Sequence, residues 1–316
     1  MILNILLLIV GFVLLIKGAD VFVDGASSTA RNFNLSPMLI GLTIVSFGTS
    51  APELAISIQS LVNGQGDMVL GNVIGSNIIN ILLILGVCAT IHSLNVKHQT
   101  VKKELPITLL ITTLFVVLIS DKVLGIPKTA FTRQDGIVLC LFFTVFIYYL
   151  ISMMRNKVDP DQETEIKYPL KKSIILTALG VAAIILGSNL VVNNATSIAK
   201  VLGISEKIIA LTVVAIGTSL PELVTSITAT VKGEYEIAIG NVVGSNIFNI
   251  GIVLGIPTAI LGDITNVSFN AIDLMVLELS AVLLFLFSFN DRKINRIEGI
   301  LMLLVFIGYY SYVIFA

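Results

Sequence analysis

Apolar residues occur along this chain in long blocks separated by short polar breaks. A helix needs about 20 apolar residues to cross the roughly 30 Å hydrocarbon core of a bilayer. By this measure we expect an all-α polytopic membrane protein with ten spans, at approximate limits 2–30, 37–62, 67–91, 104–120, 135–154, 172–199, 206–231, 236–261, 271–290 and 297–315. The first block continues without a small-residue cleavage pattern, so we interpret it as a span and not as a signal peptide.

Composition excludes several classes of protein. Of the 316 residues, 56% are hydrophobic and only 12% are charged, about half the roughly 25% charged residues of an average soluble domain. The net charge of -1 provides no basic field for nucleic acid. Cys88 and Cys140 lie in apolar runs and are expected to be small apolar fillers. The pattern implies the lipid bilayer as the partner of this chain. It gives no sign of a nucleic-acid partner or of an obligate protein partner.

The Lys and Arg residues between the blocks predict the orientation of the chain. The breaks after odd-numbered blocks hold 13 of them, and the breaks after even-numbered blocks hold five. Positively charged residues favour the cytoplasmic side of a membrane. We therefore expect a multi-pass protein of the cell membrane with both termini outside the cytoplasm.

The two halves of the chain repeat each other. Residues 40–58 align with 209–227 without a gap, and at the same offset residues 71–86 align with 240–255. The identities are concentrated in Gly, Thr, Ser, Pro, Glu and Asn, so general apolar similarity does not explain them. Each half holds five blocks, an odd number, which inverts the second half in the membrane. Inverted repeats are typical of secondary transporters that bind substrate at the midplane between the repeats.

The longest polar break separates the halves. It carries both charge signs, as a solvated linker does, and it predicts a first five-helix repeat at 1–154, a cytoplasmic linker at 155–171 and a second, inverted five-helix repeat at 172–316. Its acidic stretch at 159–165 is the alternative candidate for a regulatory Ca²⁺ site, but the spacing matches no EF-hand loop. The linker interpretation is therefore preferred.

Each half places one acid near the middle of a block, at Glu53 and Glu222. An ionised carboxylate at that depth is costly unless something neutralises it. No Lys or Arg lies at a similar depth in any block. A bound cation or a proton must therefore supply the positive charge, and the alternative is a permanently protonated glutamic acid.

The residues around each acid favour a cation site. Pro52 and Pro221 lack an N–H, and each ring clashes with the carbonyl four residues earlier, which predicts a broken helix with free carbonyl groups. Such groups are tolerated at membrane depth where they line a cavity or bind something. Helical spacing puts further residues on the face of each acid, namely Ser46, Thr49, Ser50, Glu53 and Ser57, and in the second half Ala215, Thr218, Ser219, Glu222 and Ser226.

The neighbouring blocks at 67–91 and 236–261 supply a second row of polar side chains. They recur at every fourth residue, as Asn72, Ser76 and Asn80, and as Asn241, Ser245 and Asn249. For Asn72 and Asn241, hydrogen bonding between helices and ion binding are equally good interpretations, whereas the mid-depth Asn80 and Asn249 favour ion binding. Hard cations such as Ca²⁺ and Na⁺ prefer these oxygen ligands.

The motifs GTSAPE…GNVIGSNIIN and GTSLPE…GNVVGSNIFN closely resemble the two alpha repeats of the sodium/calcium exchanger family, within the cation/calcium antiporter superfamily. The resemblance indicates a prokaryotic member in which helices 2, 3, 7 and 8, counted in the order of the ten blocks, are broken and lie at the centre. It implies that the protein is a carrier and not an enzyme. Such a carrier needs no cofactor and exchanges the transported ions Ca²⁺ and Na⁺ by alternating access.

The resemblance also implies the ligands. Four central residues that bind Ca²⁺ or Na⁺ fall on Glu53, Asn80, Glu222 and Asn249, and peripheral Na⁺ ligands fall on Ser46, Thr49, Ser50, Ser76, Ala215, Thr218, Ser219 and Ser245. Some prokaryotic members carry Asp where this chain has Asn249, so the centre here has two carboxylates and not three. If three Na⁺ replace one Ca²⁺, as in the family, the exchange is electrogenic.

Three other functions fit less well. In a Ca²⁺/H⁺ antiporter, protons on the two glutamates would replace Na⁺. Proton-coupled relatives, however, tend to carry an acid in the motifs that here span residues 71–80 and 240–249, and this chain has no acid in either. A cation channel does not need two inverted broken-helix sites. An intramembrane hydrolase needs a base, and Ser50 and Ser219 have no His or Lys at their depth.

A polar stripe runs along the first block through Lys17, Asp20, Asp24 and Arg31. We expect an ion pair three residues apart within this block, near the membrane surface. Part of a cation entry path is the alternative interpretation. The second half has Asn at the positions of both aspartates, so the stripe is not a symmetric site.

Overall fold

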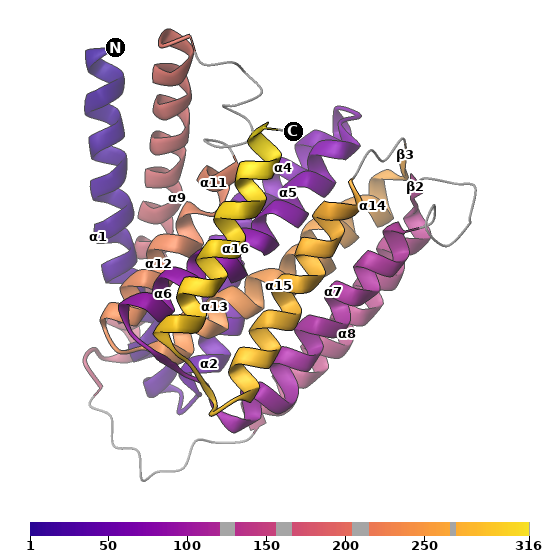
Figure 1. The fold of residues 1–316 in the computed structure, drawn as a ribbon. Helices are drawn as coiled ribbons and strands as arrows, with labels where there is room; N and C mark the ends of the chain where they lie inside the picture. Colours follow the sequence, from indigo (N-terminus) through magenta and orange to yellow (C-terminus); the bar gives the residue numbers. More distant parts are fainter. Residues whose placement is uncertain (121–129, 156–165, 204–214, 266–269, 316) are drawn as a thin grey trace.

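The computed structural model describes residues 1–120, 130–155, 166–203, 215–265 and 270–315, which are mostly helical (Figure 1). Seven helices in these ranges are long and apolar enough to cross a membrane, and the bent pair Pro37–Thr49 and Ala51–Val62 makes an eighth if it is one span. The predicted class of helical multi-pass membrane protein is confirmed, whereas the count of ten spans stays a prediction.

The first half contains long helices and helices assembled from short pieces. Three of these pieces, marked η, are π-helical. The elements are α1 (Ile2–Asn32), α2 (Pro37–Ile40), η1 (Gly41–Val45), α3 (Ser46–Thr49), α4 (Ala51–Val62), α5 (Gly66–Ile78), η2 (Ile79–Leu85), α6 (Gly86–Ile91), η3 (Thr100–Glu104), α7 (Leu105–Ile119) and α8 (Arg133–Arg155).

The second half has a similar order of elements. They are α9 (Leu170–Val201), α11 (Ala215–Thr218), α12 (Leu220–Val231), α13 (Tyr235–Phe248), η5 (Asn249–Leu254), α14 (Gly255–Leu261), α15 (Ala271–Phe289) and α16 (Arg296–Phe315). Residues 204–214, which include the start of the predicted block 206–231, and residues 156–165, which hold most of the predicted linker and its acidic stretch, lie outside the described residues.

The prediction of four broken central helices is wrong for two of them. The runs Gly66–Ile91 and Tyr235–Leu261 are each a single long helix, and the π-helical turns η2 and η5 widen them without a break. The first run contains no proline. In the second run Pro257 lies directly after the π-helical turn η5, and its missing N–H removes one backbone hydrogen bond without ending the run. Both runs therefore stay helical from end to end.

The expectation of an all-α chain also needs a small correction. The described residues form two short antiparallel sheets, one pairing β1 (Leu94–Asn95) with β4 (Lys293–Ile294), the other pairing β2 (Ala130–Phe131) with β3 (Ile264–Thr265). Each sheet joins a loop of the first half to a loop of the second, so the halves are connected outside the helices as well.

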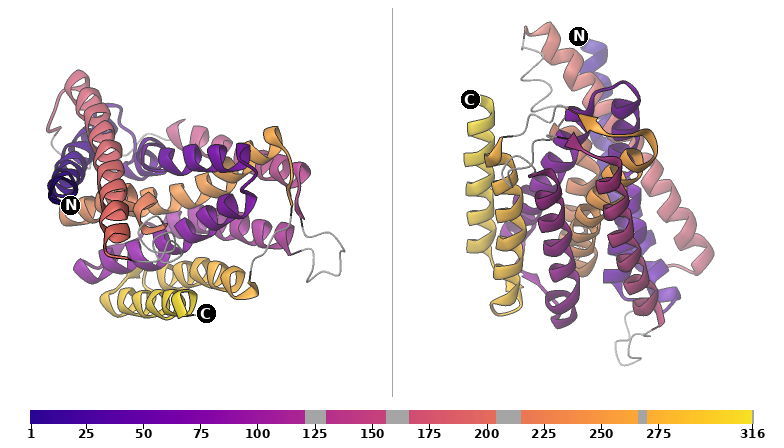
Figure 2. Two further views of the ribbon diagram at one scale, coloured as in Figure 1. Left: turned by 90° about the horizontal axis from the view of Figure 1, so that it is seen from above. Right: turned by 90° about the vertical axis from the view of Figure 1, so that its right-hand side faces the viewer.

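The centre of the bundle is formed by the two helical runs that carry the Asn motifs. In their apolar stretches, 94% of the Tyr235–Leu261 run and 72% of the Gly66–Ile91 run are buried, against at most 33% in the five other long helices. Helices α1 and α9 stand side by side at one side of the molecule (Figure 1), and α15 and α16 lie at an edge of the bundle in both views of Figure 2.

Glycines allow α13 to approach the bent helix closely. A Cβ on Gly240 would lie 3.0 Å from the Cα of Gly41, and a Cβ on Gly244 would lie 2.6 Å from Oγ of Ser46. Any larger residue would push these backbones apart. This close approach brings α13 against the polar face of α3.

Candidate ion-binding site

Each candidate acid follows a break in a helix. The first break is at Ser50, between α3 and α4, where the helix axis bends by 45° and the residue has φ -86° and ψ 6°. The second break is at Ser219, between α11 and α12, with φ -88° and ψ 7°. Pro52 and Pro221 lie in the first turn of the new helix in each case. The two halves therefore break their helices in the same way, as the prolines predict.

The two acids are buried and lack a positive partner. Glu53 and Glu222 lie in the first turns of α4 and α12 and are 1% and 0% exposed. Both carboxylate oxygens of Glu53 and Oε2 of Glu222 are buried without a hydrogen-bond partner. No Lys or Arg in the described ranges pairs with either acid. Buried carboxylates in this state require a cation or a proton.

The break of the first half contacts the acid of the second half. Ser50 Oγ, at the break of the first half, donates a hydrogen bond of 3.0 Å to Oε1 of Glu222 in the second half. The break at Ser50 and the acid Glu222 therefore meet across the two halves of the chain.

Asn72 and Asn241 fasten the broken helices to their neighbours. Asn72 Nδ2 donates to the carbonyl oxygen of Glu53 at 3.3 Å. Asn241 Nδ2 donates to Ser226 Oγ at 2.9 Å, and its Oδ1 accepts from Thr49 Oγ1 at 3.0 Å. Of the two roles predicted for this pair, the structure favours hydrogen bonding between helices.

Asn80 and Asn249 have their amide nitrogens occupied and their oxygens free. Asn80 Nδ2 donates to Asn246 Oδ1, and Asn249 Nδ2 donates to Asn77 Oδ1, each at 3.0 Å. The Oδ1 atoms of Asn80 and Asn249 are buried without a hydrogen-bond partner. This arrangement leaves two carbonyl-type oxygens available to a ligand in the centre of the protein.

Hydroxyl groups complete the donor set. The described hydroxyl side chains predicted as peripheral ligands are all buried, namely Ser46, Thr49, Ser50, Ser76, Thr218, Ser219 and Ser245. Oγ of Ser76, Ser219 and Ser245 has no hydrogen-bond partner, whereas Ser46 Oγ donates to the backbone carbonyl of Thr43 at 3.3 Å. Ala215 is the first residue of α11, and its side chain lies outside the described part of the structure.

The donor atoms are oxygens of carboxylate, amide and hydroxyl groups. Among the described residues there is no cluster of three or more His, Cys, Asp or Glu that could hold a metal ion, and both Cys88 and Cys140 are free thiols. Oxygen ligands suit hard cations such as Ca²⁺ and Na⁺ and not the transition metals that prefer sulfur or imidazole. The arrangement can bind a cation, with Glu53 and Glu222 supplying the negative charge.

Two residues of the central network were missed from the sequence. Asn77 and Asn246 lie in the repeated motif, where they occupy equivalent positions of the two halves, but they fall outside the row of every fourth residue that carries Asn80 and Asn249. Their identity in the two halves was the signal that could have found them. A rule based on spacing within one helix was too narrow, because the partner of each amide lies in the opposite half.

The polar stripe on α1 forms ion pairs different from the predicted one. Asp20 and Asp24 each lie 2.7 Å from Nζ of Lys232, which comes from the turn between α12 and α13, and Asp24 also pairs with Lys167 at 2.5 Å. The expected pair within α1, between Asp20 and Lys17, is therefore wrong, because a lysine distant in sequence packs closer. The hydrogen bond to Asp24 raises the pKa of Lys167.

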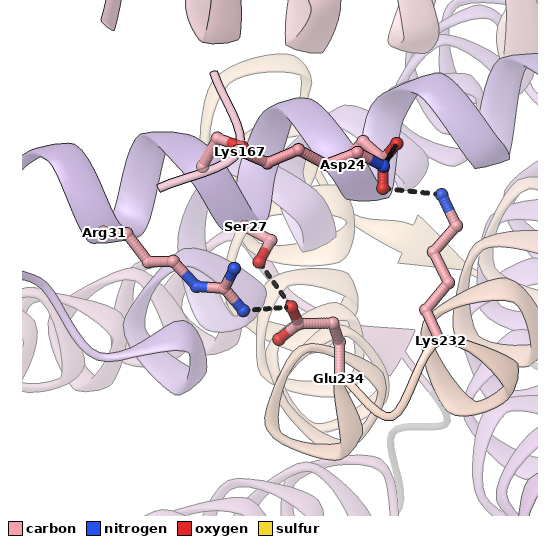
Figure 3. A pocket seen from close by; sticks show the side chains of 7 residues that line it. Asp24, Ser27, Arg31, Lys167, Lys232 and Glu234 are labelled. Atoms are coloured by element: carbon pink, nitrogen blue, oxygen red, sulfur yellow. Dashed lines mark hydrogen bonds and ion pairs between the residues drawn. The ribbon is translucent and has the colours of Figure 1, made fainter. Parts of the chain in front are cut away.

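A second ion pair continues the cluster at the end of α1. Arg31 lies 2.7 Å from Oε1 of Glu234, which also accepts a hydrogen bond from Ser27 (Figure 3). These side chains line a cavity of about 230 Å³ together with Asp24 and Lys232. The cluster connects α1 to the turn between α12 and α13.

Comparison with known proteins identifies the class. A family model described as sodium/calcium exchanger protein matches residues 3–152 and 172–315. The chain therefore belongs to the sodium/calcium exchanger family, which confirms the resemblance predicted from the repeated motifs.

Individual relatives span nearly the whole chain. CaxA of Alkalimonas amylolytica, an antiporter candidate, is 40% identical over 321 residues, covering 98% of this chain and 97% of that protein. The sodium/calcium exchanger MaX1 of Methanosarcina acetivorans is 32% identical over 340 residues, covering 97% of each. A structure of the sodium-calcium exchanger NCX_Mj soaked with 10 mM Na⁺ and zero Ca²⁺ is similar with a TM-score of 0.84 at 32% identity, covering 98% of each chain.

Proposed function

We propose that this protein is a secondary antiporter that exchanges Na⁺ for Ca²⁺ across the cell membrane. The observation that carries the proposal is the pair of buried acids, Glu53 and Glu222, whose oxygens lack a positive partner in the described residues. The family supports the identity of the ions, since both MaX1 and NCX_Mj are named as sodium/calcium exchangers. The protein is a carrier, and no catalytic role is assigned to any residue.

The proposed Ca²⁺ ligands are the four central side chains, Glu53, Asn80, Glu222 and Asn249. One Ca²⁺ balances the two carboxylate charges, and Ca²⁺ prefers 6–8 oxygens at about 2.3–2.6 Å. Bidentate carboxylates and the two free amide oxygens supply six. The proposed Na⁺ ligands are the surrounding groups at Ser46, Thr49, Ser50, Ser76, Ala215, Thr218, Ser219 and Ser245.

The proposal includes ten spans in two inverted repeats. The run from Thr100 to Ile119, formed by η3 and α7, is about 30 Å long at 1.5 Å per residue and counts as the fourth span. The seventh span is the predicted block 206–231, whose described part ends at Val231. The division into repeats at 1–154 and 172–316 joined by a cytoplasmic linker, with both termini outside, belongs to the same proposal.

Exchange follows from competition for one site. Na⁺ and Ca²⁺ cannot both neutralise the same two carboxylates, so entry of one ion favours release of the other. Alternating access requires that the site opens to one side at a time, through movement of one part of the bundle against another. If three Na⁺ replace one Ca²⁺, each cycle moves one net positive charge.

The proposed function is tested by Ca²⁺ uptake into proteoliposomes under defined gradients. Vesicles loaded with Na⁺ should take up Ca²⁺ rapidly, whereas vesicles loaded with K⁺ or carrying only an inward-acidic pH gradient should not. Uptake driven by the pH gradient alone would instead identify a Ca²⁺/H⁺ antiporter. Uptake that needs no countering gradient would identify a channel.

A further inference from the structure

Four of the six asparagines in the motifs at residues 71–80 and 240–249 form a reciprocal network across the repeats. Asn77 of the first half accepts from the amide of Asn249 in the second, and Asn246 of the second half accepts from the amide of Asn80 in the first, both at 3.0 Å. All four side chains are at most 1% exposed. Asn77 Nδ2 additionally donates to the backbone carbonyl of Asn246 at 3.3 Å.

The orientation of an asparagine decides whether it attracts or repels a cation. Half a turn of the amide group exchanges its oxygen, an acceptor, for its NH₂ group, a donor with partial positive charge. In this structure the acceptors on Asn77 and Asn246 hold the NH₂ groups of Asn249 and Asn80. The free oxygens of these two ligand amides are buried without any hydrogen-bond partner. A cation in the centre would meet oxygen and not NH₂.

We propose that Asn77 and Asn246 are positioning residues of the ion site, each of which orients the ligand amide of the opposite repeat. The inference rests on the proposed function. Partners that orient metal ligands typically contribute about 10- to 100-fold to metal affinity. Asn77→Leu should therefore weaken Ca²⁺ binding by about 10- to 100-fold, because Asn249 loses the acceptor that fixes its NH₂ group.

The two positioning residues are not equivalent, which provides a conservative variant. Asn77 uses its NH₂ group for the carbonyl of Asn246, whereas Nδ2 of Asn246 is buried without a partner in the described residues. An aspartate at 246 keeps the acceptor for Asn80 and loses no hydrogen bond. Asn246→Leu should lose Ca²⁺ affinity, and Asn246→Asp should restore most of it. Asn77→Asp should restore less, since its oxygen would face the carbonyl of Asn246.

A second substitution, at the ligand residue Asn249, distinguishes a positioning role of Asn77 from a purely structural one. Asn249→Asp removes the NH₂ group that Asn77 orients, because both carboxylate oxygens can face the ion. The effect of Asn77→Leu on Ca²⁺ affinity should therefore be much smaller in the Asn249→Asp background than in the parent. If Asn77 only supports packing, the two effects should add.

The experiment measures Ca²⁺ affinity as the Ca²⁺-dependent rise in Tm of the purified protein and as KM of Na⁺-driven uptake, with the ion-free Tm as a check of folding. Asn194→Leu, at a buried position whose amide bonds its own helix α9 at 2.7 Å, is the matched control and should keep parental affinity. Parental affinity in Asn77→Leu, or equal affinities in Asn246→Leu and Asn246→Asp, would overturn the positioning role. Failure of the unmodified protein to bind Ca²⁺ would instead overturn the proposed function on which the role rests.

Discussion

Neutralising one central acid is the sharpest perturbation of the ion site. Both carboxylate oxygens of Glu53 are buried without a partner, whereas Oε1 of Glu222 accepts a hydrogen bond from Ser50. Glu53→Gln keeps the shape of the side chain, removes one of two negative charges and places an NH₂ group among acceptor oxygens. We expect Glu53→Gln to weaken Ca²⁺ binding at least as much as Glu222→Gln does.

The size of the effect follows from the burial of the site. Removing one partner of a buried charge pair costs about 3–5 kcal/mol, and about 1.4 kcal/mol corresponds to a tenfold change in affinity. The expected loss of Ca²⁺ affinity is therefore about 100- to 4,000-fold. In the ion-free protein the same change removes repulsion between two acids, so the Tm without ions should equal or exceed that of the parent.

The assay compares Ca²⁺-dependent Tm and Ca²⁺ uptake in the parent, Glu53→Gln and a control. Glu278→Gln is the matched control, because Glu278 lies within helix α15 outside the site and accepts a hydrogen bond of 2.6 Å from Thr113. Its Ca²⁺ response should remain parental. A near-parental Ca²⁺ affinity in both Glu53→Gln and Glu222→Gln would refute the reasoning, since neither carboxylate would then hold the ion.

Three further predictions address pH, charge and packing. Asn249→Asp adds a third acid to the centre, where repulsion favours proton uptake, so Na⁺-driven Ca²⁺ uptake should fall more steeply than in the parent as the pH is lowered; identical pH profiles would place residue 249 outside the site. Because a membrane potential of 100 mV is worth about 2.3 kcal/mol per charge, Na⁺-driven Ca²⁺ uptake should change with a membrane potential clamped by K⁺ and valinomycin. Uptake that does not change with the potential would contradict the proposed net charge per cycle. Gly244→Ala places a Cβ 2.6 Å from Oγ of Ser46 and should cost about 1–3 kcal/mol, measured as a lower Tm. Gly308→Ala, which meets no described atom within 4 Å inside helix α16, should not lower Tm.

The sequence predicted the features that a single helix determines. Pro52 and Pro221 predicted the breaks that lie at Ser50 and Ser219, because a missing N–H acts on its own helix. The repeat offset located Glu53 and Glu222, since an acid at membrane depth stands out in an apolar run.

Features that depend on contacts between distant segments could not be predicted. The partner of Asp20 is Lys232, which belongs to the other half of the chain, and spacing within α1 pointed instead to Lys17. The roles of Asn77 and Asn246 depend on which end of an amide faces which neighbour. That orientation is set by packing of η2 against α13 and of α5 against η5, which periodicity within one helix does not describe.

The central claim is that Na⁺ and Ca²⁺ are exchanged at a site made by Glu53 and Glu222. It is tested most directly by following both ions in the same proteoliposomes, with labelled Na⁺ inside and labelled Ca²⁺ outside. The account predicts that Ca²⁺ entry and Na⁺ exit each require the other ion, proceed at a fixed ratio and are both lost in Glu53→Gln. Ca²⁺ entry that continues without internal Na⁺, or coupled exchange that survives in Glu53→Gln, would contradict it.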